Sequence, residues 1–259
     1  MNRLDVRLAQ LKQQQRSGLV CYFTAGAPDY SSDVALLTQI GQAGADIIEL
    51  GMPFSDPVAD GEVIEAAHHQ AITKGHTLAK TLQLVKKIRL KDEQTPIVLM
   101  GYVNPILQYG FQQFLQDAKG LIDGLLIVDL PYEYQSEYLH DVQQNQIHFI
   151  CLTAPSTPKE RLALIAQNAQ GFLYHVAENG VTGMQRQQQN LDEKIAQLKQ
   201  YFTIPIGIGF GIKTEQDIAA LKNKADLVIV GTTLVECLAQ SGVAATLQKV
   251  QKFAKVLRD

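Results

Sequence analysis

The sequence of 259 residues contains no tryptophan and only three cysteines. Cys21, Cys151 and Cys237 lie far apart and form no C-x-x-C pair, which argues against a zinc site or a disulfide framework. Cys21 and Cys151 fall within apolar, strand-like runs. We therefore expect these two to be small, buried hydrophobic side chains in a reducing compartment.

An excess of positive charge is also missing, because 23 Lys and Arg stand against 26 Asp and Glu, giving a net charge of −3. The sequence therefore offers no sign of the basic surface that binding of nucleic acid requires. No apolar run approaches the roughly 20 residues of a membrane span. Residues 1–18 are charged and lack the apolar segment of a signal peptide, so we expect a cytoplasmic protein. Leu4, Leu8 and Leu11 predict the apolar side of an N-terminal helix.

Short apolar runs alternate with helical patterns along the whole chain, and no linker interrupts them. The runs are mostly apolar without strict alternation, as expected of parallel strands covered on both faces. The predicted strands are Leu19–Thr24, Asp46–Leu50, Pro96–Tyr102, Gly124–Asp129, Ile147–Thr153, Gly171–Val176, Ile204–Gly209 and Asp226–Gly231. The predicted helices are Ser31–Ala43, Leu78–Leu90, Gln112–Ala118, Glu133–Gln144, Pro158–Asn168, Leu191–Tyr201, Glu215–Lys222 and Val243–Val256, with expected N-caps Ser32, Thr77, Thr157 and Thr214. Gln185–Gln189 is predicted to be a mobile loop.

Eight strand–helix units in a chain of this length predict an α/β fold: a single (β/α)8 TIM barrel spanning residues 1–259, with an extra N-terminal helix. A doubly wound sheet shares the alternation and is the alternative. The number of units favours the barrel, and so does the position of polar residues. The C-terminal ends of the strands carry the active sites of barrel enzymes, and the residues at or near these ends are Glu49, Tyr102, Asp129, Thr153 and Tyr174.

The stretch Asp46–Gly61 joins a predicted buried strand to a loop and contains two prominent acids. Glu49 lies among branched apolar residues, where an ionised carboxylate costs several kcal/mol unless it is compensated. It is therefore either the structural partner of a cation or a catalytic group. Asp60 is either a solvated loop acid, the N-cap of a helix over residues 63–73, or a second catalytic acid. Two carboxyls in different environments can take different pKa values and divide acid and base roles.

Two glycine-containing strand ends, Ile206–Gly211 and Val230–Thr233, suggest a site for phosphate. The loops after the seventh and eighth strands of barrels commonly bind phosphate through backbone N–H groups and a helix N-terminus. The glycines do not fit the dinucleotide pattern G-x-G-x-x-G, and alone they also fit tight strand–helix turns. Together the two segments favour phosphate, with Lys213 the one evident positive side chain.

The histidines give weaker evidence for a functional site. His68 and His69 are neighbours, and adjacent helical residues do not share a face, so we predict no metal site there. Among the later histidines, only His175, near the end of the sixth predicted strand, is placed to approach a ligand.

The stretch ELGMPFSDPVADG at 49–61 resembles the signature of the tryptophan synthase alpha chain family. The resemblance extends over essentially the whole chain, with segments in the family's order and separation. They are TAGAPD at 24–29, MGYVNPILQYG at 100–110, DGLLIVDLP at 123–131, NGVTG at 179–183 and GIGFGI at 207–212.

The resemblance implies a lyase of tryptophan biosynthesis, which cleaves indole-3-glycerol phosphate to indole and glyceraldehyde 3-phosphate in a retro-aldol reaction. It implies no metal and no cofactor in this chain. Pyridoxal phosphate would belong to the β chain of an α2β2 complex, which receives the indole through a tunnel. Glu49 matches the family's general acid/base, and Asp60 matches the residue that holds the indole N–H.

The same resemblance implies further site residues. The indole slot would be lined by Tyr22, Ile64, Met100, Leu126 and Tyr174, with Tyr102 close to the glycerol part; the phosphate would bind amides of Gly183, Phe210, Gly211, Gly231 and Thr232. Thr182 would lie on a loop, Ala177–Gln189, that closes over the site and meets Asp60. The surface that touches the β chain would include Pro53, Asp56 and Asn104. The chain departs from common family residues at Ala27, His175, Glu178 and Thr232.

Two other functions are compatible with such a chain. One is a subunit whose main role is to activate a β chain, and the other is a different phosphate-binding barrel enzyme, such as an indole glycerol phosphate synthase. The intact pair Glu49 and Asp60 favours the lyase over the first. The lack of lysine in the predicted strands favours it over the second, which would use a catalytic Lys or an Asp at another strand end.

Overall fold

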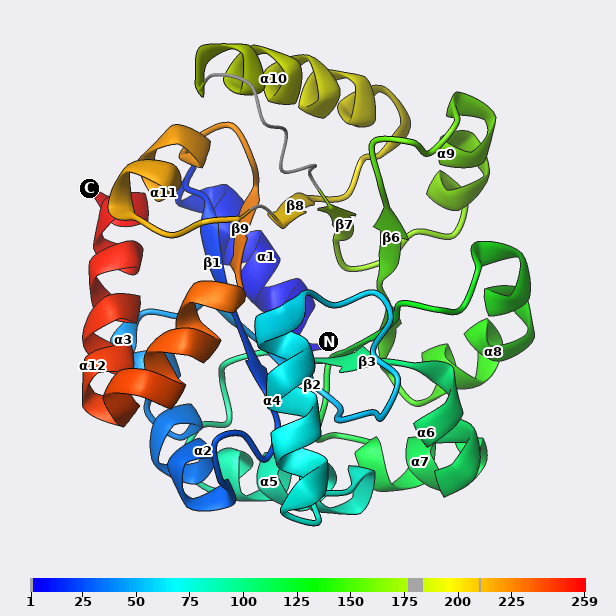
Figure 1. Cartoon of the computed structure of the whole chain (residues 1–259). Helices are drawn as coiled ribbons and strands as arrows, with labels where there is room; N and C mark the ends of the chain where they lie inside the picture. Colours follow the sequence, from blue (N-terminus) through cyan, green and yellow to red (C-terminus); the bar gives the residue numbers. More distant parts are fainter. Residues whose placement is uncertain (1, 177–183, 210) are drawn as a thin grey trace.

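The computed structural model describes residues 2–176, 184–209 and 211–259, and for residues 184–190 it describes the backbone alone. Within these residues, parallel strands form a ring that helices surround (Figure 1). The strands are β1 (Gly18–Thr24), β2 (Ile47–Gly51), β3 (Ile97–Gly101), β4 (Gly124–Ile127), β5 (His148–Phe149), β6 (Cys151–Thr153), β7 (Leu173–Val176), β8 (Ile206–Gly209) and β9 (Leu227–Val230).

The ring closes through one interrupted strand. Neighbouring strands follow the order β5-β4-β3-β2-β1-β9-β8-β7-β6, and all their pairings are parallel. β5 and β6 are the two parts of the predicted strand Ile147–Thr153, separated at Ile150, whose N–H donates to the carbonyl of Leu125 at 2.9 Å. The two ends of the order are therefore consecutive in the chain. This confirms the predicted TIM-barrel fold class against the doubly wound alternative.

Helices follow the strands around the ring, and several units carry two of them. The helices are α1 (Arg3–Gln13), α2 (Tyr30–Leu37), α3 (Ile40–Ala43), α4 (Glu62–Thr73), α5 (Leu78–Arg89), α6 (Val103–Tyr109), α7 (Phe111–Ala118), α8 (Tyr132–Gln144), α9 (Lys159–Ala166), α10 (Met184–Tyr201), α11 (Glu215–Leu221) and α12 (Thr232–Arg258). α12 bends at Gly242, whose φ of 77° interrupts the helical backbone.

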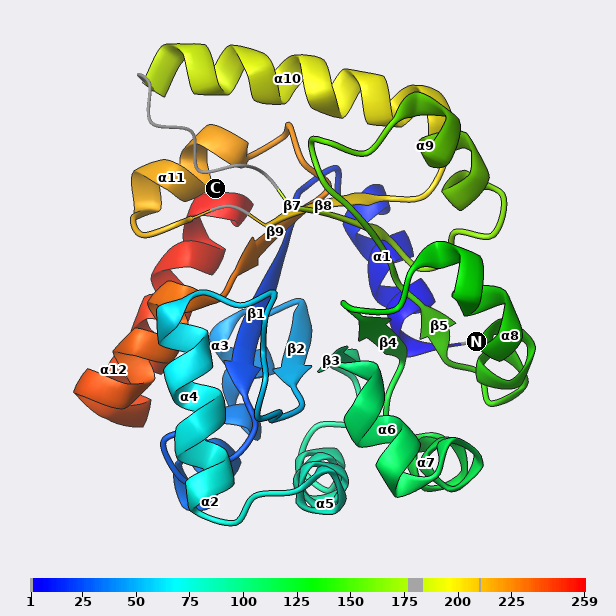
Figure 2. The same ribbon diagram turned by 45° about the vertical axis from the view of Figure 1, so that its right-hand side comes forward.

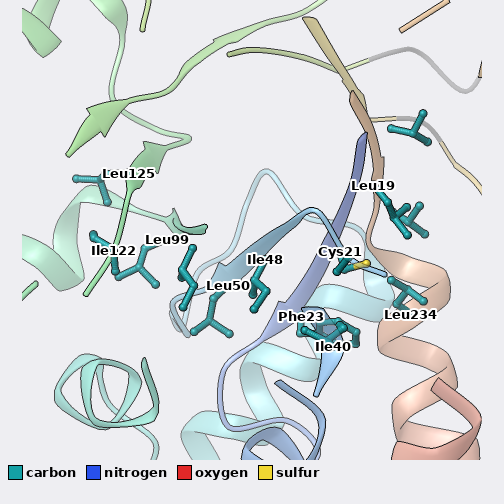
Figure 3. Packing of buried hydrophobic residues seen from close by; sticks show 14 of the residues in the cluster. Leu19, Cys21, Phe23, Ile40, Ile48, Leu50, Leu99, Ile122, Leu125 and Leu234 are labelled. Carbon is teal, nitrogen blue, oxygen red and sulfur yellow. The ribbon is translucent and has the colours of Figure 1, made fainter. Parts of the chain in front are cut away.

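The main core lies between the strands and the surrounding helices. Alternate side chains of each strand point outward, as the geometry of a strand requires. On β1 these are Leu19, Cys21 and Phe23, which pack with Ile40 of α3 and Leu234 of α12 (Figure 3). The expected burial of Cys21 and Cys151 is confirmed, and both are free thiols.

The N-terminal helix α1 covers the N-terminal end of the barrel. The predicted apolar side, Leu4, Leu8 and Leu11, is buried against inward-facing residues of the strands. These residues are Val20, Ile47, Val98, Leu126, Ile150, Phe172, Leu227 and Ile229. The opposite, C-terminal end of the ring is therefore the end left for a site.

Several local predictions need correction. Thr77 and Thr214 cap their helices as expected, but Ser32 and Thr157 do not. Asp29 caps α2 by accepting from the N–H of Ser32, since its carboxylate precedes the first turn. The N-cap position of α9 is Pro158, while the Thr157 hydroxyl accepts from Ala154 N–H.

The prediction of a mobile loop at Gln185–Gln189 is wrong, because these residues form part of α10. Asp129, expected near a strand end, accepts through its carboxylate from the N–H of Val103, the first residue of α6, at 2.8 Å. In the described ranges, no helix is both long and apolar enough to cross a membrane.

The packing of α1 gives a test of this fold. Leu4 is fully buried, so Leu4→Ala should lower the free energy of unfolding by roughly 2–5 kcal/mol in urea denaturation. Val6 on the same helix is 37% exposed, and Val6→Ala should change the free energy of unfolding by less than about 0.5 kcal/mol. Equal effects of the two substitutions would show that α1 does not pack on the barrel floor.

Candidate active site at the C-terminal end of the barrel

Glu49 enters the barrel from β2. Its neighbours Ile48 and Leu50 belong to the core outside the ring, so the alternation of side chains along a strand turns Glu49 inward. The residue is 1% exposed, and neither carboxyl oxygen has a hydrogen-bond partner among the described residues. Burial, and then the charge of Asp60, raise the pKa of Glu49 to about 8. The carboxyl is therefore largely protonated at neutral pH.

Asp60 lies on the loop between β2 and α4, where Tyr102 holds it. The Tyr102 hydroxyl donates to Asp60 Oδ2 at 2.7 Å and accepts from the N–H of Ala59 at 3.0 Å. Burial raises the pKa of Asp60, and the hydrogen bond from Tyr102 opposes that shift. The N-cap position of α4 is occupied by Gly61, so Asp60 does not cap this helix.

Tyr102 was predicted to lie close to the glycerol part of the substrate. The structure places its hydroxyl on the loop of Asp60, where it contacts both Ala59 and Asp60. Its ring packs on Phe54 of the same loop, with ring centroids 5.1 Å apart. Tyr102 therefore supports the position of the second acid.

Two tyrosine rings lie beside the acids inside the ring of strands. The charges of Glu49 and Asp60 both help raise the pKa of Tyr22 and of Tyr174, after burial as the largest cause. The Tyr22 hydroxyl would lie 2.3 Å from a Cβ at position 51, so Gly51 is required to admit this ring. Tyr174 uses the space at Gly209 in the same way.

The five residues predicted to line an indole slot belong to two neighbouring apolar clusters in the structure. Tyr22 packs with Ile64 and Met100, and Met100 also packs with Leu126 and Tyr174. All five predicted residues thus lie together at the end of the barrel where Glu49 points. These apolar walls account for the strong desolvation of its carboxyl.

The start of α12 carries two of the three described residues of the predicted phosphate site, and the third, Gly211, lies on an exposed loop. Gly231 occupies the N-cap position, Thr232 begins the helix, and the first N–H groups of a helix have no partner within it. The Thr233 hydroxyl donates to the carbonyl of Ile212 at 2.6 Å and so joins this helix to the exposed loop at Gly211. The sequence placed Thr233 in this segment but did not predict its hydrogen bond to Ile212, because that contact depends on the approach of two loops.

The helix α4 completes this end of the barrel. It lies beside the first half of α12 in both views of the chain (Figures 1 and 2). A Cβ added to Gly231 would lie 3.5 Å from Tyr22 and 3.7 Å from Ile64 of α4, which are ordinary contacts. The protein itself would therefore tolerate a side chain at Gly231, and the absence of one leaves space next to Tyr22 and Ile64.

Several predicted site residues lie outside the described residues: Thr182, Gly183, Phe210 and the departure Glu178. The same holds for residues 177–183 of the predicted closing loop. Of the predicted partner surface, Asp56 and Asn104 are exposed and Pro53 is half-buried.

Two departures from common family residues have structural explanations. Ala27 is buried in the cluster of Tyr22, Ala67 and Ala71, where a small apolar side chain fits. The prediction that His175 approaches a ligand is wrong. It points out of the barrel, is 1% exposed, and pairs with the hydroxyl of Thr153 at 2.9 Å.

His68 is a site residue that sequence reasoning missed. The imidazole lies between the backbone of Phe54, at 3.0 Å, and the carboxylate of Asp60, at 3.6 Å. The predicted absence of a metal site at His68 and His69 remains a prediction; within the described part of the chain, no three His, Cys, Asp or Glu residues gather as a metal site would require.

The arrangement provides one protonated carboxyl in an apolar slot, a second acid held at its rim, and a helix N-terminus nearby. Such a site can exchange a proton with an aromatic substrate while it binds an anionic group at the helix.

Comparisons with known proteins agree with this geometry. The sequence model of the family described as tryptophan synthase alpha chain matches residues 8–259. Tryptophan synthase subunit alpha from Legionella pneumophila str. Paris is similar at 35% identity and a TM-score of 0.93, over 99% of this chain and 98% of that chain. A tryptophan synthase structure from M. tuberculosis in space group F222 has 32% identity and a TM-score of 0.91, over 100% of this chain and 99% of that one. The chain therefore belongs to the tryptophan synthase alpha chain family.

Proposed function

We propose that this chain cleaves indole-3-glycerol phosphate to indole and glyceraldehyde 3-phosphate. The observation that carries the proposal is the carboxyl of Glu49, buried in an apolar slot with neither oxygen hydrogen-bonded among the described residues. A structural role as the partner of a cation is not supported, since the described residues provide no salt bridge to Glu49. A group so costly to bury is better explained by chemistry.

In the proposed reaction, Glu49 donates its proton to the indole ring carbon that carries the glycerol chain. The bond between that carbon and the glycerol chain breaks, and its electron pair returns to the indole ring. The hydroxyl on the glycerol carbon that was bonded to the indole ring loses its proton to the Glu49 carboxylate. This carbon becomes the carbon of the aldehyde. One proton is given and one is taken back, so the enzyme returns to its starting state.

Asp60 would act on the other side of the indole. Protonation of the ring carbon places positive charge on the ring, and an ionised carboxylate that accepts from the indole N–H stabilises it. The hydrogen bond from Tyr102 favours this ionised form of Asp60. Separate acid and electrostatic roles require the two acids to take different protonation states; burial raises the pKa of both, and only Asp60 has a hydrogen bond that opposes the rise.

The phosphate would bind the N–H groups at Gly231 and Thr232, at the start of α12. The helix dipole favours an anion there by roughly 0.3–2 kcal/mol. We propose that the predicted amides of Gly183, Phe210 and Gly211 add to this site, and that Thr182 and its loop close over the substrate. The proton transfers are assigned to carboxyls, so we propose that the chain needs neither a metal nor a cofactor of its own.

The alternative phosphate-binding barrels use a lysine or an acid at another strand end. The nine described strands contain no lysine, and the buried inward acid is Glu49 on β2. This favours cleavage by Glu49 over those reactions.

We also propose a β chain as partner, in an α2β2 complex that receives the indole and holds pyridoxal phosphate in its β chains. The loop of Asp60 and the helix α6 each expose an apolar side chain: Val58 on the loop is 85% exposed, and Leu107 on α6 is 47% exposed. Predicted contact residues Asp56 and Asn104 belong to the same loop and to α6. A protein surface of this kind fits a partner better than solvent. The chain could therefore both cleave substrate and activate its partner.

Removal of the Glu49 acid tests the proposed chemistry. Glu49→Gln should lower the rate of indole release by roughly 10²–10⁴-fold, because the amide cannot transfer the proton. Binding of a glycerol-phosphate analogue should stay within a few-fold of wild type. The assay, run in EDTA with and without a β chain, would refute the assigned role if the variant turned over at nearly the wild-type rate.

The raised pKa of Glu49 also predicts a dependence of stability on pH. The carboxyl changes its pKa from about 4.5 in the unfolded chain to about 8 in the folded one. Its contribution to stability is fully present below pH 4.5 and is lost as the pH rises through 8. Glu49→Gln should therefore become more stable relative to wild type between pH 5 and pH 8, by an amount on the order of a few kcal/mol, since one pKa unit is worth ~1.4 kcal/mol. Urea denaturation at both pH values measures the difference in the free energy of unfolding between the variant and wild type, and Glu137→Gln, at an exposed position, is the control. A difference that does not change with pH would contradict the raised pKa of Glu49.

The phosphate assignment predicts a separate effect at Gly231. Gly231→Ala should leave the fold intact, since its Cβ meets only ordinary contacts, but should weaken binding of phosphate esters by roughly tenfold, or ~1.4 kcal/mol. Binding of indole, which has no phosphate, should change much less. Isothermal titration with both ligands makes the comparison, and equal losses for both would remove the phosphate from this helix.

A further inference from the structure

His68 is buried on the inner side of α4, at 1% exposure, and is surrounded by the second acid's loop. Its Nδ1 accepts from the N–H of Phe54 at 3.0 Å. Its Nε2 lies 3.6 Å from Asp60 Oδ2 and 3.5 Å from the hydroxyl of Tyr22. The His68 side chain thus contacts the loop between β2 and α4 near both ends of that loop.

These contacts assign the tautomer of His68. A backbone N–H can only donate, so Nδ1 must be the unprotonated acceptor and the proton must be on Nε2. Burial, and then the neighbouring His69, lower the pKa of His68 to about 4, so the ring is neutral near pH 7. Its N–H group therefore faces Asp60 and Tyr22, and the Tyr22 hydroxyl has a second partner in Thr24 at 3.2 Å.

The two groups that hold Asp60 meet on one oxygen. The hydroxyl of Tyr102, a residue that follows β3 in the chain, donates to Oδ2 at 2.7 Å, and His68 Nε2 on α4 lies 3.6 Å from the same oxygen, a close contact that is longer than a hydrogen bond. The hydrogen bond from Tyr102 and the contact with His68 together restrict the position of the Asp60 carboxylate. A fixed carboxylate is what recognition of an indole N–H requires.

We propose that His68 is a positioning residue, whose neutral imidazole joins the backbone of Phe54 to the carboxylate of Asp60 and so orients Asp60 for the substrate. The inference rests on the proposed cleavage of indole-3-glycerol phosphate. It adds an imidazole N–H group on α4, close to the second acid, which nothing in the pattern of the acids themselves indicates.

The competing explanation is packing alone, because the His68 ring also lies edge-on to the Tyr102 ring, with centroids 6.5 Å apart. Two substitutions separate the explanations. His68→Gln can keep an N–H donor near the position of Nε2, and His68→Asn can keep an acceptor near the position of Nδ1 but has no donor that reaches Asp60. A packing role predicts equal losses, whereas a positioning role predicts that the glutamine rescues.

The test measures indole release by the full chain with its β partner. His68→Asn should lower kcat by roughly 10–100-fold with a smaller change in KM, and His68→Gln should lose no more than about threefold. His69→Gln, on the exposed side of the same helix, should behave as wild type. Wild-type kcat in His68→Asn, or equal losses in His68→Asn and His68→Gln, would overturn the proposal.

The pH profile supplies a readout that packing would not move. The titratable groups that face Asp60 are Glu49, Tyr22, Tyr102, Tyr174 and His68. Loss of the donor disfavours the ionised form of Asp60, so the acidic limb of kcat/KM should move to higher pH in His68→Asn and not in His68→Gln. An unmoved limb in His68→Asn contradicts the positioning role.

A measurement on the wild-type protein does not depend on folded variants or on turnover. Long-range ¹⁵N–¹H NMR of protein labelled in histidine should show His68 neutral at pH 7, with the proton on Nε2. A proton on Nδ1, or a charged ring, would overturn the proposal whatever the kinetics show. Wild-type protein that releases no indole even with a β chain would instead refute the proposed cleavage, while the tautomer still decides the role of His68.

Discussion

A carboxyl group buried without a hydrogen-bond partner is the constraint on which the rest of this site depends. Burying Glu49 in ionised form would cost several kcal/mol, and the protein avoids that cost by keeping the proton. The apolar slot and the raised pKa are thus one physical fact. The same surroundings that make the acid form stable also exclude water from the carbon that would receive its proton.

The barrel makes this burial possible because its other interactions are well satisfied. At the N-terminal end, the buried acids have cationic partners: Asp46 binds Arg7 and Arg16, and Asp123 binds Arg3 and Arg89. Stability comes from that end and from the core outside the ring, whereas the C-terminal end holds Glu49, which has no such partner among the residues that the structure describes. This division matches the general separation of stability and chemistry in barrels.

Sequence reasoning predicted the parts that depend on pattern. The apolar runs of β1 and β2 and the regular count of units identified the barrel, and the stretch around Glu49 and Asp60 identified the acids. It failed where three-dimensional proximity decides. The contact of Phe54 with His68, the tie of Thr233 to Ile212 and the interruption between β5 and β6 depend on the path of the backbone, which no spacing encodes. His175 failed for a simpler reason, since one residue along a strand reverses the face.

The ionisation state of Glu49 is the central claim, and NMR can observe it directly. Carboxyl ¹³C shifts of protein labelled in glutamate, with Glu49→Gln to assign the resonance, would follow the titration of this one group. The account predicts a midpoint near pH 8, as burial beside Asp60 requires. A midpoint near the ordinary value of about 4.3 would contradict it and would leave Glu49 without its acid form at neutral pH.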